Sequence, residues 1–94
     1  MHGLPENVYY KIKEVINKFS KYQFKLFGSR ARGDYHASSD IDVAIFGEVT
    51  SQDEFLIKNE FDKIDTAYKI DVVVVKENTK KSLVESIMRE GVEF

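Results

Sequence analysis

Apolar residues recur every three or four positions near the start of the chain. Between Glu6 and Ser20 they fall at Val8, Ile12, Val15, Ile16 and Phe19. This spacing places them on one face of an amphipathic helix, and Pro5 suits the first turn of that helix. We therefore predict a helix over residues 6–20.

A period of two follows the helical pattern. Tyr22–Phe27 alternates aromatic and polar side chains and ends at Gly28, which favours a short strand followed by a tight turn. In Asp40–Phe46 the apolar side chains Ile41, Val43 and Ile45 share one face of a second strand. The run Val72–Val75 is apolar on both faces, which predicts a third strand buried at the centre of the sheet.

The remaining segments favour helices. Ser51 and Glu54 have the spacing of a capping box, which predicts a helix over about residues 52–66. Asn78 and Thr79 are suited to cap a last helix that Gly91 ends. The expected order is helix, strand, short helix, strand, helix, strand, helix. This order predicts an α/β or α+β fold, a small mixed β-sheet flanked by helices. The second and third strands can then pair in parallel, whereas the direction of the first pair stays open.

Composition narrows the class of protein. The 94 residues predict one domain over residues 1–94, with room for a modest core. A formal net charge of -2 argues against a nucleic-acid partner, because such proteins usually carry a basic stripe. With no cysteine in the sequence, disulfides and thiolate chemistry are excluded. The sequence contains no apolar run of membrane-spanning length and no secretory leader, so we expect a cytoplasmic protein with no membrane partner.

Gly28 and Ser29 are the first candidate for chemistry. A glycine at the end of a strand lets the backbone approach a ligand closely. If residues 29–32 form a helical turn, its free N–H groups point outward toward an anion. A triphosphate is an anion that such a site could bind. Arg30, Arg32 and Lys25 lie close by in sequence, and their simplest role is to face that triphosphate.

Asp40 and Asp42 are the second candidate. Their spacing of two sends both carboxylates to the same face of a strand. Two such charges about 4 Å apart repel each other by roughly 4 kcal/mol at an effective dielectric near 20, so only a cation makes that geometry useful. Mg²⁺ is the natural ion, because it takes oxygen ligands and is shared between carboxylates and phosphates. Asp71 is a third acid that is suited to a second ion or to the proton of an attacking hydroxyl.

These residues resemble a known signature. Gly28-Ser29-Arg30-Ala31-Arg32-Gly33 followed by Ser39-Asp40-Ile41-Asp42-Val43 is similar to the motif of the polymerase-beta-like nucleotidyltransferases, specifically their minimal branch. The closing segment Ile87-Met88-Arg89-Glu90-Gly91-Val92 is also similar to that branch. The resemblance therefore spans nearly the whole chain.

The resemblance implies Mg²⁺-dependent transfer of a nucleoside monophosphate, with ATP as donor and two metal ions. It implies that the catalytic and metal-binding residues are Asp40, Asp42 and Asp71, and that the nucleotide-binding residues are Gly28, Ser29, Arg30, Arg32 and Ser39. The minimal branch often acts as the antitoxin of a small helical HEPN-type toxin, so the implied acceptor is a hydroxyl on that partner.

Two other functions stay open at this point. In the first, the chain is a non-catalytic nucleotide- or metal-binding module that neutralises a partner by complex formation. In the second, it is a catalytic subunit that modifies a small molecule. A homo-oligomer is also left open. The presence of all three acids argues against a decayed site, and the absence of an acceptor-binding domain argues against the small-molecule reading.

Overall fold

The computed structural model describes residues 2–94. Their elements follow in the order α1 (Glu6–Lys18), β1 (Gln23–Phe27), α2 (Ser29–Arg32), β2 (Ile41–Phe46), α3 (Ser51–Asp62), β3 (Ile70–Val74), α4 (Lys81–Glu90) and β4 (Val92–Glu93). The seven predicted elements are confirmed in type and order. The two-residue strand β4 was not predicted.

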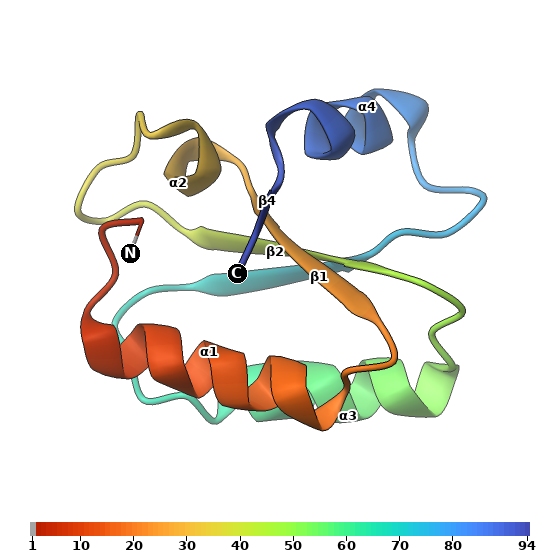
Figure 1. The fold of residues 1–94 in the computed structure, drawn as a ribbon, viewed down its shortest axis with the longest axis horizontal. Coiled ribbons are helices and arrows are strands. Elements are labelled where there is room, and N and C mark those ends of the chain that lie inside the picture. The colour runs from red at the N-terminus through yellow and green to blue at the C-terminus, as the bar shows by residue number, and fades with distance from the viewer. Residues whose placement is uncertain (1) are drawn as a thin grey trace.

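The four strands form one mixed sheet in the order β3-β2-β1-β4. Strands β1 and β2 pair antiparallel, which settles the direction that the sequence left open. Strands β2 and β3 pair in parallel across the helical connection, an arrangement that the sequence permitted. Helices α1 and α3 lie on one face of this sheet, whereas α2 and α4 lie on the other (Figure 1).

The prediction that the valine strand is central was wrong. Strand β3 lies at an edge of the sheet, and of its residues only Val74 is fully buried. An apolar run of this kind reports that both faces of a strand are partly covered, and it carries no information about hydrogen bonding at the strand's two edges. The interior strands are β2 and β1.

The main core lies between the sheet and helices α1 and α3. It gathers alternate residues of β1 and β2 with the apolar stripes of the two helices, and its completely buried members are Ile12, Leu26, Ile41, Val43, Ile45 and Ile57. On the opposite face, Ala44 of β2 and Ile87 of α4 are also completely buried. The sheet is therefore covered on both sides, although the second side carries less helix because α2 has only 4 residues.

Two predicted helix caps were misplaced. Helix α3 is capped by Thr50, whose hydroxyl accepts a hydrogen bond from the Asp53 N–H, so the cap lies one residue before Ser51. Helix α4 begins after Lys80 without a side-chain cap. The Thr79 hydroxyl accepts instead from the Lys76 N–H, which closes a turn in the preceding loop.

No helix in the described part of the chain, residues 2–94, has both the length and the apolar character that crossing a membrane requires.

Candidate active site

Gly28 follows β1 and is the N-cap of α2. Its backbone has a conformation that residues with a side chain rarely adopt. Its φ is 78° and its ψ is -158°, a region of backbone space that is essentially restricted to glycine. A Cβ atom at this position would also collide with Asp42 Oδ2 and lie 3.3 Å from Asp42 Cγ. Gly28 is therefore required both by the turn and by the carboxylate beside it.

The short helix α2 follows this turn directly. The N–H groups of Ala31 and Arg32 donate to the Gly28 carbonyl, and the N–H of Gly33 donates to the Ser29 carbonyl. These bonds begin at the third residue of the helix, so the N–H groups of Ser29 and Arg30 are its initial backbone donors. The predicted helical turn after Gly28 is thus confirmed, and it begins directly after the glycine that lies against the Asp42 carboxylate.

Asp42 lies between two strands that both contribute to the site. In the sheet register it is opposite Phe27, the residue before Gly28, and opposite Asp71 on its other side. The parallel pairing thus makes Asp42 and Asp71 cross-strand neighbours. Strand order and register together therefore place three features in a row across the sheet: the glycine turn, Asp42 and Asp71.

The charge environment of Asp42 is unfavourable to its ionised form. Partial burial raises the pKa of Asp42 above its usual range, and the negative charges of Asp71 and Asp40 raise this pKa further. The cations Arg32 and Lys69 oppose this shift without cancelling it. A cation bound at this carboxylate would relieve both the burial and the repulsion.

Asp40 is exposed to solvent, and Asp71 is partly exposed. Asp40 precedes the first residue of β2, outside the fully buried core. The Asp71 side chain is 40% exposed and pairs with Lys69 at 3.5 Å, a contact that was not predicted from the sequence. Within residues 2–94 no group of three or more histidine, aspartate or glutamate side chains is arranged to hold a metal ion. The three acids are thus neighbours, but they do not form a complete ligand set by themselves.

Arg30 is the one buried charged residue among those described, at 1% exposure. Its Nε and Nη2 donate to the Ser39 carbonyl at 3.2 and 3.1 Å, and its Nη1 donates to the His2 carbonyl at 3.0 Å. Its guanidinium lies 5.0 Å from the ring centre of Tyr35 and 4.8 Å from that of Tyr68. These contacts give no support to direct nucleotide binding by Arg30. They make it the support of the loop that leads to Asp40.

Ser39, predicted as a nucleotide ligand, takes part in this same loop. Its carbonyl accepts from Arg30, and its hydroxyl accepts from the His36 N–H at 2.7 Å. The observed contacts of Ser39 hold the loop before Asp40 in place.

Arg32 and Lys25 differ in their relation to the site. Arg32 lies near enough to Asp42 to lower the pKa of that carboxyl, and it pairs with Asp34 and with Glu90 of α4. Lys25 instead reaches toward the ring of Phe46, at the end of β2 away from Asp42. Of the two basic residues, only Arg32 joins the candidate site.

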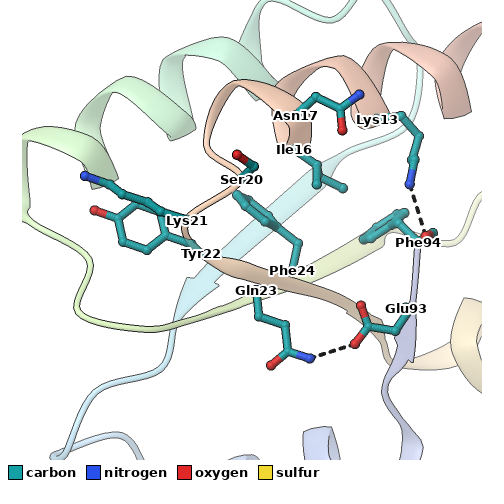
Figure 2. Close-up of a pocket in the computed structure, with 10 residues that line it drawn as sticks. All are labelled: Lys13, Ile16, Asn17, Ser20, Lys21, Tyr22, Gln23, Phe24, Glu93 and Phe94. Atoms are coloured by element: carbon teal, nitrogen blue, oxygen red, sulfur yellow. Dashed lines mark hydrogen bonds between the residues drawn. The ribbon is translucent and has the colours of Figure 1, made fainter.

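Two clefts differ in their distance from these carboxylates. One, of about 400 Å³, is lined by Asp71 together with Phe61, Asp62, Ile64, Thr66, Tyr68, Lys69 and Ile70. The other, of about 370 Å³, lies between α1, the start of β1 and the C-terminal residues, where Lys13 donates to the Phe94 carbonyl (Figure 2). That second cleft is at the opposite end of β1 from Gly28 and includes none of the predicted site residues.

Comparisons with known proteins agree with the geometry. The family model described as "Polymerase beta, Nucleotidyltransferase" matches residues 10–94. A protein of Methanocaldococcus jannaschii assigned as a protein adenylyltransferase is 52% identical over 44 residues, which are 40% of this chain and 44% of that protein. The match thus spans less than half of that relative. The protein adenylyltransferase MntA of Thermococcus cleftensis is 28% identical over 81 residues, which cover 85% of this chain and 81% of MntA.

Solved structures share the fold. A toxin-antitoxin structure with AMP-PNP aligns with a TM-score of 0.66 and 22% identity, over 89% of this chain and 69% of that one. A nucleotidyltransferase structure from Sulfolobus solfataricus aligns with a TM-score of 0.53 and 22% identity, over 98% of this chain and 89% of that one. Because the family model covers most of the chain, this protein belongs to the polymerase beta nucleotidyltransferase family and is a nucleotidyltransferase.

Proposed function

We propose that this chain transfers AMP from ATP to a hydroxyl group of a partner protein and thereby acts as an antitoxin. The observation that carries the proposal is the contact between Gly28 and Asp42, with Asp71 in register beside Asp42. This contact puts the phosphate mouth, by which we mean the backbone of Gly28, Ser29 and the start of α2, next to a pair of carboxylates. Phosphoryl and nucleotidyl transfer depend mainly on positioning and on charge stabilisation, which is what such an arrangement provides.

The triphosphate is assigned to the mouth formed by Gly28, Ser29 and the start of α2. Backbone N–H groups donate to phosphate oxygens there. Because Gly28 has no side chain, its backbone can lie directly against the carboxylate of Asp42. Arg32 adds a positive charge close to the same carboxylate. We retain Arg32 as a nucleotide-binding residue and assign Arg30 and Ser39 to the support of the Asp40 loop.

The donor set fits Mg²⁺ bound together with a nucleotide. Asp40, Asp42 and Asp71 supply hard oxygen ligands. Burial and the negative charges of Asp71 and Asp40 raise the pKa of Asp42, and a cation bound there would offset this cost. Mg²⁺ is commonly held by one or two carboxylates with substrate phosphates completing its shell, which agrees with the incomplete ligand set of residues 2–94 alone. When bound, the ion neutralises charge on the reacting phosphate.

The acceptor hydroxyl is assigned to the Asp71 side of the site. Its oxygen forms a bond to the α-phosphorus, the bond to the leaving pyrophosphate breaks, and Asp71 accepts the hydroxyl proton. Asp71 suits this role because it is partly exposed and lies on an edge strand, which a second protein can approach. The names of the two curated relatives support a protein acceptor. The toxin-antitoxin neighbour supports a toxin as that acceptor. Our assignment of that toxin to the HEPN type rests on the resemblance to the minimal branch alone.

Transfer is tested with ATP labelled in its α-phosphate. The chain is incubated with Mg²⁺ and the protein encoded beside it, and label is expected on that partner. Asp42→Ala should abolish the transfer, whereas Asp65→Ala, which changes an acid in the loop before β3, should retain it. Label on the partner with Asp42→Ala would refute the assigned role of Asp42.

The alternative function is neutralisation by binding alone. It is favoured by the open edge of β3, which offers a protein surface that does not require chemistry. The double variant Asp40→Ala, Asp42→Ala separates the two functions. If it binds the toxin normally but no longer protects cells, catalysis is required, and if it still protects them, binding suffices.

A further inference from the structure

We infer that Glu90, at the end of α4, is a positioning residue that holds the Arg32 guanidinium in place for the triphosphate. This inference rests on the proposed function and extends it to a residue outside the glycine-serine and aspartate motif. Glu90 Oε2 accepts from Arg32 Nη1 at 2.9 Å, although the two residues are 58 positions apart in sequence. The contact joins α4 to the helix that begins at the phosphate mouth.

Arg32 needs such a contact because it lies on an exposed surface. Its side chain is 43% exposed, and its second partner, Asp34, is 64% exposed and two residues away. A long arginine side chain loses considerable rotamer freedom when it is fixed, so an exposed neighbour alone holds it poorly. Glu90 is only 21% exposed and is therefore the more constrained of the two partners.

The backbone behind Glu90 is itself fixed. The Gly91 N–H donates to the Ile87 carbonyl at 2.7 Å, and a Cβ atom at residue 91 would collide with that same carbonyl oxygen. The next residue, Val92, pairs with Leu26 of β1. Leu26 is two residues before Gly28, so the strand that ends at the phosphate mouth also anchors the segment that carries Glu90.

The arrangement leaves part of the guanidinium available. Among residues 2–94, Nε of Arg32 donates to Asp34 and Nη1 donates to Glu90, and no bond within these residues involves Nη2. A guanidinium held by two of its nitrogens presents the third in a defined direction. That donor is the one assigned to a triphosphate oxygen.

A double-mutant cycle on nucleotide affinity tests the inference. The dissociation constant of AMP-PNP with Mg²⁺ is measured by calorimetry for the wild type, Glu90→Ala, Arg32→Ala and the double variant. Each single change should weaken binding by about 3- to 10-fold, and the double variant should be no weaker than Arg32→Ala alone. Glu90→Gln, which keeps an acceptor but loses the charge, should fall between wild type and Glu90→Ala. Glu85→Ala, an exposed change on the same helix, should leave the affinity unchanged.

The outcomes are distinct. Additive effects of the two single changes, or tighter binding by Glu90→Ala, would overturn the positioning role. A lower melting temperature of Glu90→Ala with unchanged affinity would show a purely structural contact and would also overturn it. If the wild type binds no AMP-PNP, the proposed function itself fails, whereas normal wild-type binding with additive variants refutes only the role of Glu90.

Discussion

Gly28 approaches Asp42 so closely that the carboxylate occupies the space in which any side chain at residue 28 would begin. The two residues come from adjacent antiparallel strands, and the register places Asp42 opposite the residue before the glycine. This contact explains why the glycine and the aspartate form one functional unit even though they are 14 positions apart in sequence. It also makes the unit sensitive to a single methyl group.

Gly28→Ala should inactivate the protein and destabilise it. The new Cβ collides with Asp42 Oδ2 and forces a non-glycine residue into a strained backbone region, so we expect a loss of about 2–4 kcal/mol in the free energy of unfolding. Urea denaturation measures the loss. Gly33→Ala is the matched control, because Gly33 also has a positive φ, of 94°, but a Cβ atom there would meet nothing within 4 Å. It should cost only about 1 kcal/mol. Equal losses at the two positions would contradict the proposed contact.

Asp42→Asn should stabilise the metal-free protein at neutral pH. The pKa of Asp42 is raised in the folded state, so the folded protein binds this proton more tightly than the unfolded chain. As the pH rises above the ordinary aspartate range and through the raised pKa, ionisation penalises the folded state, and the penalty is complete above that pKa. Asparagine removes it, so the melting temperature at pH 7 should rise by about 2–5 °C.

The difference in melting temperature between wild type and Asp42→Asn should shrink steadily toward low pH. It should disappear where Asp42 is protonated in both the folded and the unfolded state. Melting curves recorded in EDTA across the acidic range measure it. A constant difference at all pH values would show that the stabilisation does not come from the carboxylate charge.

Arg30→Lys should destabilise the fold without removing a nucleotide ligand. A lysine has a single donor nitrogen and no planar guanidinium, so it loses part of the three bonds to the Ser39 and His2 carbonyls and the contacts with Tyr35 and Tyr68. We expect a loss of about 2–3 kcal/mol in unfolding free energy. Arg89→Lys, at a side chain that is 68% exposed, should change stability by less than about 0.5 kcal/mol. If Arg30→Lys is stable but loses affinity for AMP-PNP, Arg30 contacts the nucleotide as the motif predicted.

Mg²⁺ and nucleotide should stabilise the protein together more than either does alone. Residues 2–94 supply only part of a metal-ligand set, and phosphate oxygens complete it. At 100 times its dissociation constant, a ligand that binds only the folded state adds about 2.7 kcal/mol, which thermal melts detect readily. Asp42→Ala should remove the additional stabilisation that Mg²⁺ and nucleotide give when they are present together. A full response to Mg²⁺ without nucleotide would point to a metal site that the three acids do not explain.

The strand-glycine-helix unit was more predictable from the sequence than the edges of the sheet. Local periodicity and turn chemistry indicate this unit and the aspartate strand, and the helical connection permitted the parallel pairing of β2 and β3 that is observed. The edge position of β3 was not predictable from Val72–Val75, because apolar side chains describe the covering of faces only. Strand β4 is too short to show a period of two.

Three features of the site depend on contacts between distant segments. The burial of Arg30 requires the N-terminal segment, the loop before β2 and Tyr68 to converge, which no local pattern reveals. The pairing of Glu90 with Arg32 depends on the small strand that ties the end of α4 to β1. Lys69 lies two residues before Asp71, and that spacing was the one available signal for their ion pair.

Adenylyl transfer to a partner is tested most simply by the intact mass of this chain and of the protein encoded beside it after incubation together with ATP and Mg²⁺. We predict that the partner gains the mass of one or more adenylyl groups with wild-type protein and gains none with Asp42→Ala. An unchanged partner mass in a stable wild-type complex would contradict catalysis and would leave neutralisation by binding as the function.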